Sequence, residues 1–246
     1  LGAPDMAFPK LNAIAFWLVP VFAVVLMGSF FAPGGPASSG WWSYPPMSLQ
    51  NPLNHFINGQ FLWILAVALS GISSIMGAVN FVTTIIRMRA PGMGFFRMPI
   101  FIWTAWAAQT IQLVGLPALT GGAVMLLFDL SFGTSFFRPE RGGDPVLFQH
   151  FFWFYSHPAV YVLVLPVFGI FSELFPVYAR KPLFGYRFVA IASFGITFLS
   201  LIVWVHHMFY SGTPMWMRNL FMATTMLIAV PTVSYTHLRA HETVHY

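Results

Sequence analysis

The stretch Val146–Pro176, VLFQHFFWFYSHPAVYVLVLPVFGIFSELFP, decides the fold class of this chain. It is apolar almost throughout, and its only charged side chain, Glu173, lies close to its end. An α-helix needs about 20 consecutive apolar residues to cross the hydrocarbon core of a bilayer. The stretch exceeds that length, which leaves room for tilt, and it therefore predicts a transmembrane helix.

The composition extends this interpretation to the whole chain. Of the 246 residues, 58% are hydrophobic and only 7% are charged, whereas a soluble domain carries about 25% charged residues. A water-soluble monomer is therefore excluded, because too little charge is present to cover its surface. The absence of cysteine excludes disulfides, iron–sulfur clusters and cysteine nucleophiles. The net charge of +5 is better explained by membrane orientation than by binding to nucleic acid.

Six apolar stretches are candidates for membrane spans, although the last is shorter than a full span. They are Leu11–Phe31, Gly59–Ile86, Ile100–Phe128, Val146–Pro176, Phe188–Tyr210 and Leu220–Val233. No soluble linker separates these stretches. The sequence shows no internal repeat. The sequence predicts an all-α fold, a polytopic transmembrane helix bundle of about six spans. Because the chain begins with Leu-Gly-Ala-Pro-Asp, we expect it to be a piece of a longer protein.

Basic residues collect in alternate connections between these stretches. One side of the membrane receives Lys10, Arg87, Arg89, Arg97, Arg180, Lys181 and Arg187, and the other receives Arg138, Arg141 and Arg218. The positive-inside rule then places the Arg87 loop, the Arg180 loop and the start of the chain, with Asp5, in the cytoplasm. We expect a multi-pass protein of a bacterial inner membrane.

Three histidines lie within predicted spans, where polar side chains are rare and are functional candidates by default. His157 opens the sequence HPAVY in the fourth span, and His206 and His207 close the fifth. Two separate segments thus bring imidazoles to similar depths near the outer face. Imidazole binds copper, iron and zinc, and three nitrogens with an open position form a reactive metal site. The alternative is that each histidine forms structural hydrogen bonds inside the bundle.

The spacing of these residues sets a geometric condition on a shared ion. Adjacent residues on a regular helix point about 100° apart, so His206 and His207 can share an ion only through different ring nitrogens or through a locally distorted helix. Tyr161 follows His157 by four residues and lies on the same helix face. A phenol beside a metal can supply both a proton and an electron.

The motifs around these histidines resemble subunit I of the haem–copper oxygen reductases, the cytochrome c oxidase family. The likeness rests on WFYSHPAVY (Trp153–Tyr161), VWVHHM (Val203–Met208), GAPDMAFP (Gly2–Pro9), NFVTT (Asn80–Thr84), RAPG (Arg89–Gly92) and GGDPVLFQH (Gly142–His150), in family order. It covers residues 1–233 and implies the third to eighth of twelve core helices. It also implies that His157, His206 and His207 bind one copper ion, with Tyr161 covalently joined to His157.

Other residues match the family by position. Trp41 and Tyr44 match an aromatic motif beside the low-spin haem, and Trp153 and Trp204 match tryptophans near the binuclear centre; plain packing is an equal alternative for these aromatics. The proton route of the D channel is matched by Asp5, Asn12, Ser73, Ser74 and Asn80, and that of the K channel by Ser172 and Thr232. Taken singly, a serine or threonine in a span more often bonds to its own helix.

One departure from the family concerns the end of the D channel. Many members carry a glutamate where this chain has Ala159, and here the pair Tyr155-Ser156 lies just before it. This is similar to a subclass in which a Tyr-Ser pair replaces that glutamate. We therefore expect Tyr155 and Ser156 to relay protons in its place.

A second departure begins after Val233. The family continues with a helix that carries an essential lysine of the K channel, and that position is Tyr235 here. Arg239 and Glu242 would each cost about 2.5 kcal/mol or more at the centre of a span. We interpret residues 1–233 as the membrane domain and 234–246 as a tail of vector, adapter or frame-shifted origin.

The resemblance implies a catalytic subunit that reduces O₂ to water at a haem-iron/copper pair and couples this to proton translocation. The ligands of the two haems would lie outside this piece, so the piece alone is expected to be inactive. Implied partners are subunits II and III, cytochrome c or quinol as electron donor, O₂ and the lipid bilayer, with no nucleic acid. The alternatives are a nitric oxide reductase of the same superfamily and a proton-coupled secondary transporter, although a transporter would more often show repeated halves.

Overall fold

The computed structural model describes residues 1–50 and 55–243, with side chains as far as Thr236. These residues are all-α, and the extended pairing among them is limited to one isolated bridge between Pro36 and Gly59. The α-helices are α1 (Pro9–Gly28), α2 (Gly59–Arg87), α3 (Ile100–Ser131), α4 (Pro145–Ala179), α5 (Tyr186–Ser200), α6 (Met215–Leu227) and α7 (Ala229–Thr243). Short 3-10 helices are η1 (Ser29–Phe31), η2 (Met47–Leu49), η3 (Phe95–Arg97), η4 (Pro139–Arg141) and η5 (Trp204–Met208).

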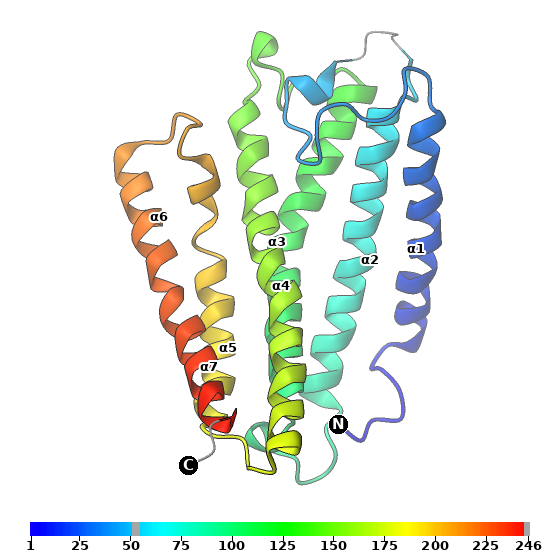
Figure 1. Ribbon diagram of the computed structural model, residues 1–246. Coiled ribbons are helices and arrows are strands. Elements are labelled where there is room, and N and C mark those ends of the chain that lie inside the picture. Colours follow the sequence, from blue (N-terminus) through cyan, green and yellow to red (C-terminus); the bar gives the residue numbers. More distant parts are fainter. Residues whose placement is uncertain (51–54, 244–246) are drawn as a thin grey trace. The chain divides into compact units, whose positions relative to one another are not determined.

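Five of the described segments are long and apolar enough to cross a membrane. They are Pro9–Phe31, Gly59–Arg87, Ile100–Ser131, Pro145–Ala179 and Tyr186–Met208. They confirm the first five expected spans, and a helix suits this environment because it satisfies every interior backbone group within one segment. Figure 1 shows α2, α3 and α4 as long continuous rods. The prolines inside α4, among them Pro158, do not end that helix.

The sixth expected stretch, Leu220–Val233, falls across two consecutive helices, α6 and α7. They meet at Ile228, and α6 has 13 residues and α7 has 15. Pro231 explains the break, because it has no N–H to donate to the carbonyl of Leu227, four residues earlier. The ladder resumes at once, since the Thr232 amide donates to the Ile228 carbonyl at 3.4 Å. Neither helix alone reaches the length of about 20 residues that a span needs.

The chain divides into two compact units, whose boundaries fall inside α2, α3 and α4. Unit 1 contains Leu1–Pro9, Ala78–Gly115 and Ser156–Tyr246, and unit 2 contains Lys10–Gly77 and Leu116–Tyr155. In unit 2, α1 runs beside the first part of α2 (Figure 1), and the Ser73 hydroxyl donates to the Ala15 carbonyl at 2.7 Å. The core of unit 2 is made of Leu49, Ile64, Ala68, Ala123, Leu126, Leu127, Phe137, Phe148 and Phe152.

In each unit, a close helix crossing depends on a glycine. In unit 2, a Cβ built on Gly71 would lie 2.1 Å from Oγ1 of Thr120. In unit 1, a Cβ on Gly169 would lie 2.1 Å from Oγ1 of Thr104 and 2.9 Å from Cα of Phe101. Small residues at such crossings let helix backbones approach closely, which is how membrane helices gain packing contacts without a hydrophobic driving force.

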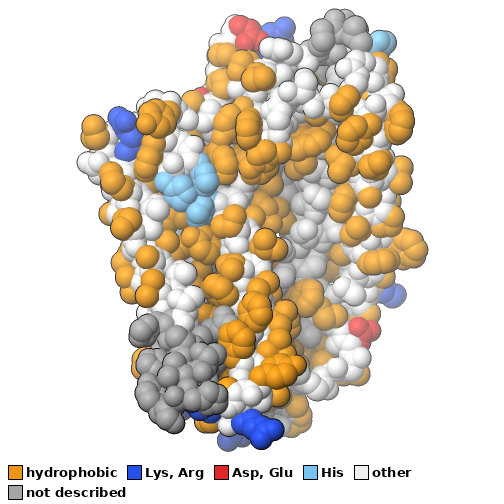
Figure 2. Space-filling model, in the orientation of Figure 1, with side chains coloured by type: hydrophobic (Ala, Val, Ile, Leu, Met, Phe, Trp, Pro, Cys, Tyr) orange, Lys and Arg blue, Asp and Glu red, His pale blue; other side chains and the backbone are white. Residues whose placement is uncertain are grey.

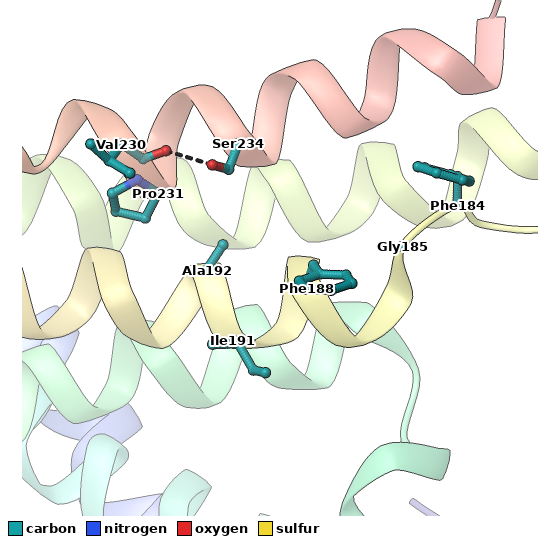
Figure 3. Close-up of a pocket in the computed structure, with 8 residues that line it drawn as sticks. All are labelled: Phe184, Gly185, Phe188, Ile191, Ala192, Val230, Pro231 and Ser234. Carbon is teal, nitrogen blue, oxygen red and sulfur yellow. Dashed lines mark hydrogen bonds between the residues drawn. The ribbon is translucent and has the colours of Figure 1, made fainter.

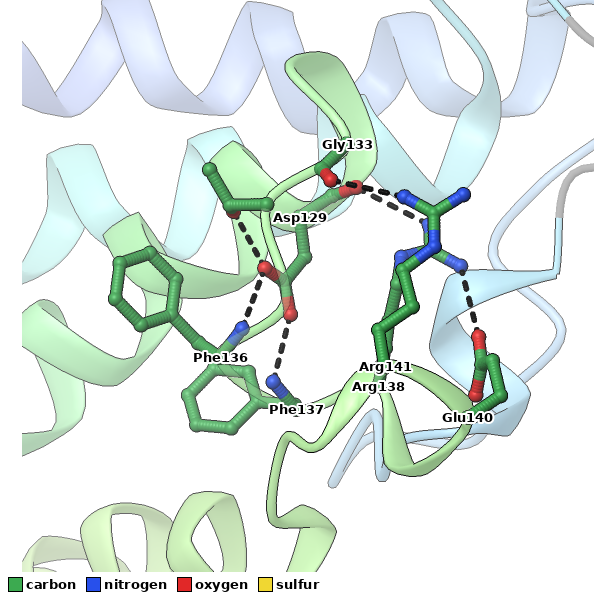
Figure 4. A network of polar contacts seen from close by, with 8 residues as sticks. Asp129, Gly133, Phe136, Phe137, Arg138, Glu140 and Arg141 are labelled. Atoms are coloured by element: carbon green, nitrogen blue, oxygen red, sulfur yellow. Dashed lines mark hydrogen bonds and ion pairs between the residues drawn. The ribbon is translucent and has the colours of Figure 1, made fainter.

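Asp129, at the end of α3, organises the connection to α4 within unit 2 (Figure 4). Its carboxylate is fully buried and accepts hydrogen bonds from the Thr134 hydroxyl at 2.5 Å and from the amides of Phe136 and Phe137 at 3.0 and 2.8 Å. Arg138 donates to its backbone carbonyl at 3.1 Å. A buried charge is tolerated only when hydrogen-bonded in this way. Asp129 therefore stabilises the loop from inside.

A groove of about 740 Å³ lies between α5 and α7 in unit 1 (Figure 3). Its lining residues are Phe184, Gly185, Phe188, Ile191, Ala192, Val230, Pro231 and Ser234. The one hydroxyl among them, on Ser234, donates to the Val230 carbonyl of its own helix at 2.8 Å. The lining carries no titratable side chain.

Candidate metal centre

Three imidazoles of unit 1 converge on one point. His157 belongs to α4, and His206 and His207 belong to η5. One nitrogen from each lies within 4.8 Å of the corresponding nitrogens of the other two. Figure 2 shows a patch of histidine side chains on the visible face. The sequence predicted this convergence from two separate segments.

The backbone is distorted where it carries the histidine pair. Helix α5 ends at Ser200, and after a short turn the chain continues as the 3-10 helix η5. The imidazole centroids of His206 and His207 lie 4.3 Å apart, with the rings inclined by 41°. The local distortion that the sequence analysis gave as one condition for a shared ion is therefore present. Tighter 3-10 turns inside an otherwise α-helical run often mark functional positions.

The separations of the nitrogens suit a metal ion. His157 Nδ1 and His207 Nε2 are 2.9 Å apart. Two imidazole nitrogens that bind one ion at about 2.0–2.1 Å, with an angle of about 90–120°, lie about 2.8–3.6 Å apart. The imidazole centroids of His157 and His206 are 4.4 Å apart, with the rings perpendicular.

The chemistry of this donor set also fits a metal. The nitrogen of His157 that faces His207 is Nδ1. Nε2 of the same ring is buried and has no hydrogen-bond partner in the structure, which is unusual for a polar atom at this depth. The group consists of imidazoles alone, without a carboxylate. Such a set suits copper, iron or zinc better than calcium or magnesium, which prefer oxygen ligands.

Tyr161 lies one turn along α4 from His157. Its ring centroid is 5.1 Å from that of His157, with an angle of 56° between the planes. The neighbouring candidates for proton relay, Tyr155 and Ser156, precede His157 on the same helix and are both partly buried. Tyr155 belongs to unit 2 and Ser156 to unit 1, so the division between the units falls between them.

Thr225 contacts the histidine group, and the sequence analysis did not identify it. Its Oγ1 lies 2.9 Å from His206 Nδ1. The residue belongs to α6, which packs against η5 after the chain turns back on itself. A pair of threonines in an apolar helix was the only available signal, and such threonines usually bond to their own helix.

The aromatic candidates divide between the two units. Trp41, Tyr44 and Trp153 lie together in unit 2, where the Trp153 indole donates to the Tyr44 hydroxyl and the centroids of Trp41 and Trp153 are 5.9 Å apart. Burial raises the pKa of Tyr44, and the hydrogen bond from Trp153 partly opposes this. Trp204 belongs to unit 1 and packs edge-on against Phe221, with centroids 4.8 Å apart.

Two D-channel candidates, Asp5 and Asn80, lie in unit 1 on segments that are joined by hydrogen bonds. The Asn80 amide accepts from the Phe8 N–H at 2.9 Å and donates to the Phe8 carbonyl at 3.2 Å, and Thr84 Oγ1 accepts from the Ala7 N–H at 2.9 Å. The Asp5 carboxylate accepts from the Met6 N–H at 2.6 Å. Asn80 and Thr84 thus hold the segment that carries Asp5 against the end of α2.

The other three D-channel candidates belong to unit 2. Ser73 is buried and bonded to the α1 backbone, Ser74 is partly buried, and Asn12 is exposed.

The two K-channel candidates lie in unit 1 and differ in their contacts. The Ser172 hydroxyl lies 2.8 Å from the hydroxyl of Tyr235, and both side chains are buried. Thr232 donates to the Ile228 carbonyl of its own helix at 2.8 Å. Tyr235 also stacks on Phe168, with centroids 4.8 Å apart. Tyr235 is therefore a packed phenol that contacts both Ser172 and Phe168.

Comparison with known proteins gives a consistent result. The family model described as "Cytochrome C and Quinol oxidase polypeptide I" matches residues 1–243. Cytochrome c oxidase subunit 1 of Synechocystis sp. is 56% identical over 232 residues, which is 94% of this chain and 41% of that protein. The same subunit of Thermostichus vulcanus is 52% identical with equal coverage, and that of Cereibacter sphaeroides is 45% identical over 238 residues. The chain thus spans about two fifths of the length of these relatives. It belongs to the family of cytochrome c and quinol oxidase polypeptide I.

Proposed function

We propose that this chain is part of the catalytic subunit of a terminal respiratory oxidase, which reduces O₂ to water at a haem-iron/copper centre and couples the reaction to proton translocation. The observation that carries the proposal is the convergence of three imidazoles from α4 and η5, with the Tyr161 phenol 5.1 Å from His157 between ring centroids. The full activity belongs to a longer protein, because the relatives named cytochrome c oxidase subunit 1 are more than twice as long.

His157, His206 and His207 would hold one copper ion. When bound beside a haem iron, copper supplies an electron and an electrophilic site for oxygen. The imidazoles fix the position of this site, because one is anchored on the long helix α4 and two on the distorted segment η5. The two haems and their ligands would come from parts of the protein outside this chain.

Tyr161 would deliver a proton and an electron to the site. The resemblance implies a covalent bond from this residue to His157, and the buried His157 Nε2 without a hydrogen-bond partner is compatible with such a bond. Each electron taken up by O₂ on the way to water is matched by one proton. A phenol one turn from the metal ligand is a short-range source of both.

Protons would reach the site through two sets of polar residues. The first set is Asp5, Asn12, Ser73, Ser74 and Asn80, followed by Tyr155 and Ser156 in place of the glutamate found in many relatives. The second set is Ser172 and Thr232. Hydroxyls and amides are suited to this task, because low-dielectric protein does not conduct protons without polar groups or ordered water.

The five apolar helices and the bacterial relatives support a multi-pass protein of an inner membrane. We propose that Asp5 and the Arg87 and Arg180 loops face the cytoplasm. The proposed partners are oxidase subunits II and III and, as electron donor, cytochrome c or a quinol.

We also propose that residues 234–246 form a tail that is not native to the oxidase. Tyr235 is nonetheless buried and hydrogen-bonded to Ser172. This residue of the tail therefore packs against α4, irrespective of the origin of the tail. The nucleotide sequence of the source gene across residue 233 tests the proposal. A lysine codon at position 235 would support it, and an unchanged reading frame through 246 would refute it.

Oxygen consumption tests the proposed activity. The complete subunit, produced from the source gene with its partner subunits, should consume O₂ when supplied with reduced cytochrome c or a quinol. A His207→Ala variant should lose this activity and retain the low-spin haem spectrum, because His207 belongs to the proposed copper site. Nitric oxide reduction without oxygen consumption would favour the related reductase instead.

A further inference from the structure

Methionine is concentrated on helix α6. Four of the 13 residues of this helix are methionine (Met215, Met217, Met222 and Met226), whereas the whole chain of 246 residues has 13. Met217 is partly buried, but Met215, Met222 and Met226 expose 63%, 52% and 72% of their surface. Because consecutive residues of a helix are about 100° apart, these three lie within about 40° of one another around the axis. They therefore form one stripe along α6, which we call the methionine stripe.

The methionine stripe runs from the first residue of α6 to the level of the three-histidine group. At about 1.5 Å of rise per residue, Met222 lies about 10 Å and Met226 about 16 Å along the axis from Met215. Thr225, which lies between these last two positions in the sequence, has its Oγ1 2.9 Å from His206 Nδ1, and α6 packs against η5. The inner end of the stripe is therefore beside the segment that carries two of the three imidazoles.

The chemistry of methionine suits a copper ion that must pass through apolar surroundings. A thioether sulfur is a soft ligand and favours Cu(I) over hard cations. The side chain is otherwise apolar, so a membrane helix can display it without the cost of a charged ligand. The chain contains no cysteine, so methionine supplies its only sulfur ligands. Met222 and Met226 are four residues apart, which puts their Cβ atoms about 5–6 Å apart, and their flexible side chains let both sulfurs reach one ion.

We propose that the methionine stripe is an entry path for Cu(I), with Met222 and Met226 forming a transient binding site beside the three-histidine group. The inference rests on the proposed function, since copper is the ion assigned to His157, His206 and His207. Thioether ligands are exchanged for imidazole ligands along this path, and the oxidation state of the ion does not change. Such a path is needed because hydrocarbon offers no water or polar group to a cation.

The rate of copper uptake by the assembled oxidase tests the inference. The enzyme is depleted of copper with a chelator and then given Cu(I), and its copper content is followed over time by metal analysis. The double variant Met222→Leu with Met226→Leu removes both sulfurs and nearly conserves the side-chain volumes. It should take up Cu(I) at least about tenfold more slowly, because leucine offers the ion no ligand, and it should reach the same final content. The matched control is Met27→Leu with Met47→Leu, which removes two sulfurs of similar exposure, 59% and 58%, from unit 2.

The outcomes separate the inference from the proposed function. Uptake of Cu(I) by the Met222/Met226 double variant at the rate of the unaltered enzyme would overturn the inference and leave the stripe as a lipid-facing surface. Equal slowing in the control variant, or equal slowing when copper is supplied as Cu(II), would also overturn it. X-ray absorption of Cu(I) added to a His207→Ala enzyme gives a second measurement, since sulfur ligation should be present there and lost when both methionines are leucine. An unaltered enzyme that holds no copper would instead overturn the proposed function, while that sulfur ligation would still support the binding site on α6.

Discussion

Replacing Gly169 by alanine tests the close crossing of α3 and α4 in unit 1. The added Cβ would lie 2.1 Å from Thr104 Oγ1 and 2.9 Å from the Cα of Phe101. The Thr104 hydroxyl is held in place by its own hydrogen bond to the Phe101 carbonyl at 2.9 Å. Because the second contact is with backbone, rotation of a side chain cannot relieve it, and the helices must move apart.

The magnitude follows from the contacts. Forcing an extra methyl group into a packed site costs about 1–3 kcal/mol, and a backbone clash belongs at the upper end. Gly77 and Gly121 are matched controls, because both are helical and a Cβ on either would meet no atom within 4 Å. Alanine at an open helical position should stabilise by about 0.5–1 kcal/mol. The two kinds of variant should therefore shift stability in opposite directions.

Thermal unfolding of the purified, assembled oxidase, followed by tryptophan fluorescence, measures the difference. Gly169→Ala should lower the unfolding temperature, in line with a loss of about 2–3 kcal/mol. Gly77→Ala and Gly121→Ala should raise it, in line with a gain of about 0.5–1 kcal/mol. Equal shifts in all three variants would refute the close approach of α3 and α4 at Gly169.

Three further variants test the site and the loop. Tyr161→Phe should retain copper but lower oxygen consumption by about 10²–10⁴-fold, because a proton donor is lost. Unchanged oxygen consumption would contradict the proposed role of Tyr161 as a proton donor. The double variant Tyr155→Phe with Ser156→Ala should slow oxygen consumption and proton pumping, measured in vesicles, and full retention of both would exclude the proposed relay. Asp129→Ala leaves three donors without their acceptor and should destabilise by more than about 3 kcal/mol in thermal unfolding. Asp129→Asn, which keeps an acceptor oxygen, should lose less, and an equal loss would contradict this account of the loop.

The spans could be predicted from the sequence because apolar length is a local property. Each of the first five stretches carries the information within itself, as Val146–Pro176 illustrates. The break at Ile228 was harder to foresee, because Pro231 lies inside an apolar run and its effect depends on the missing donor to Leu227. Pro158, by contrast, leaves α4 continuous. A proline therefore does not predict a helix end unless its surroundings are known.

The three-histidine group could be predicted in its residues but not in its contacts. His157, His206 and His207 were identifiable because polar side chains are rare in apolar spans. Thr225 was not, because its partner lies 19 positions earlier and the contact exists only once α6 packs against η5. Asp129 shows the same limit, since a carboxylate in a loop sequence gives no sign that the loop folds around it.

Metal analysis of the complete subunit, purified with its partner subunits, tests the central claim most directly. The account predicts one copper ion for every two haems, with the copper lost in a His157→Ala variant that keeps both haems. Iron without copper would contradict it in favour of a nitric oxide reductase, and the absence of bound metal would contradict it in favour of a transporter.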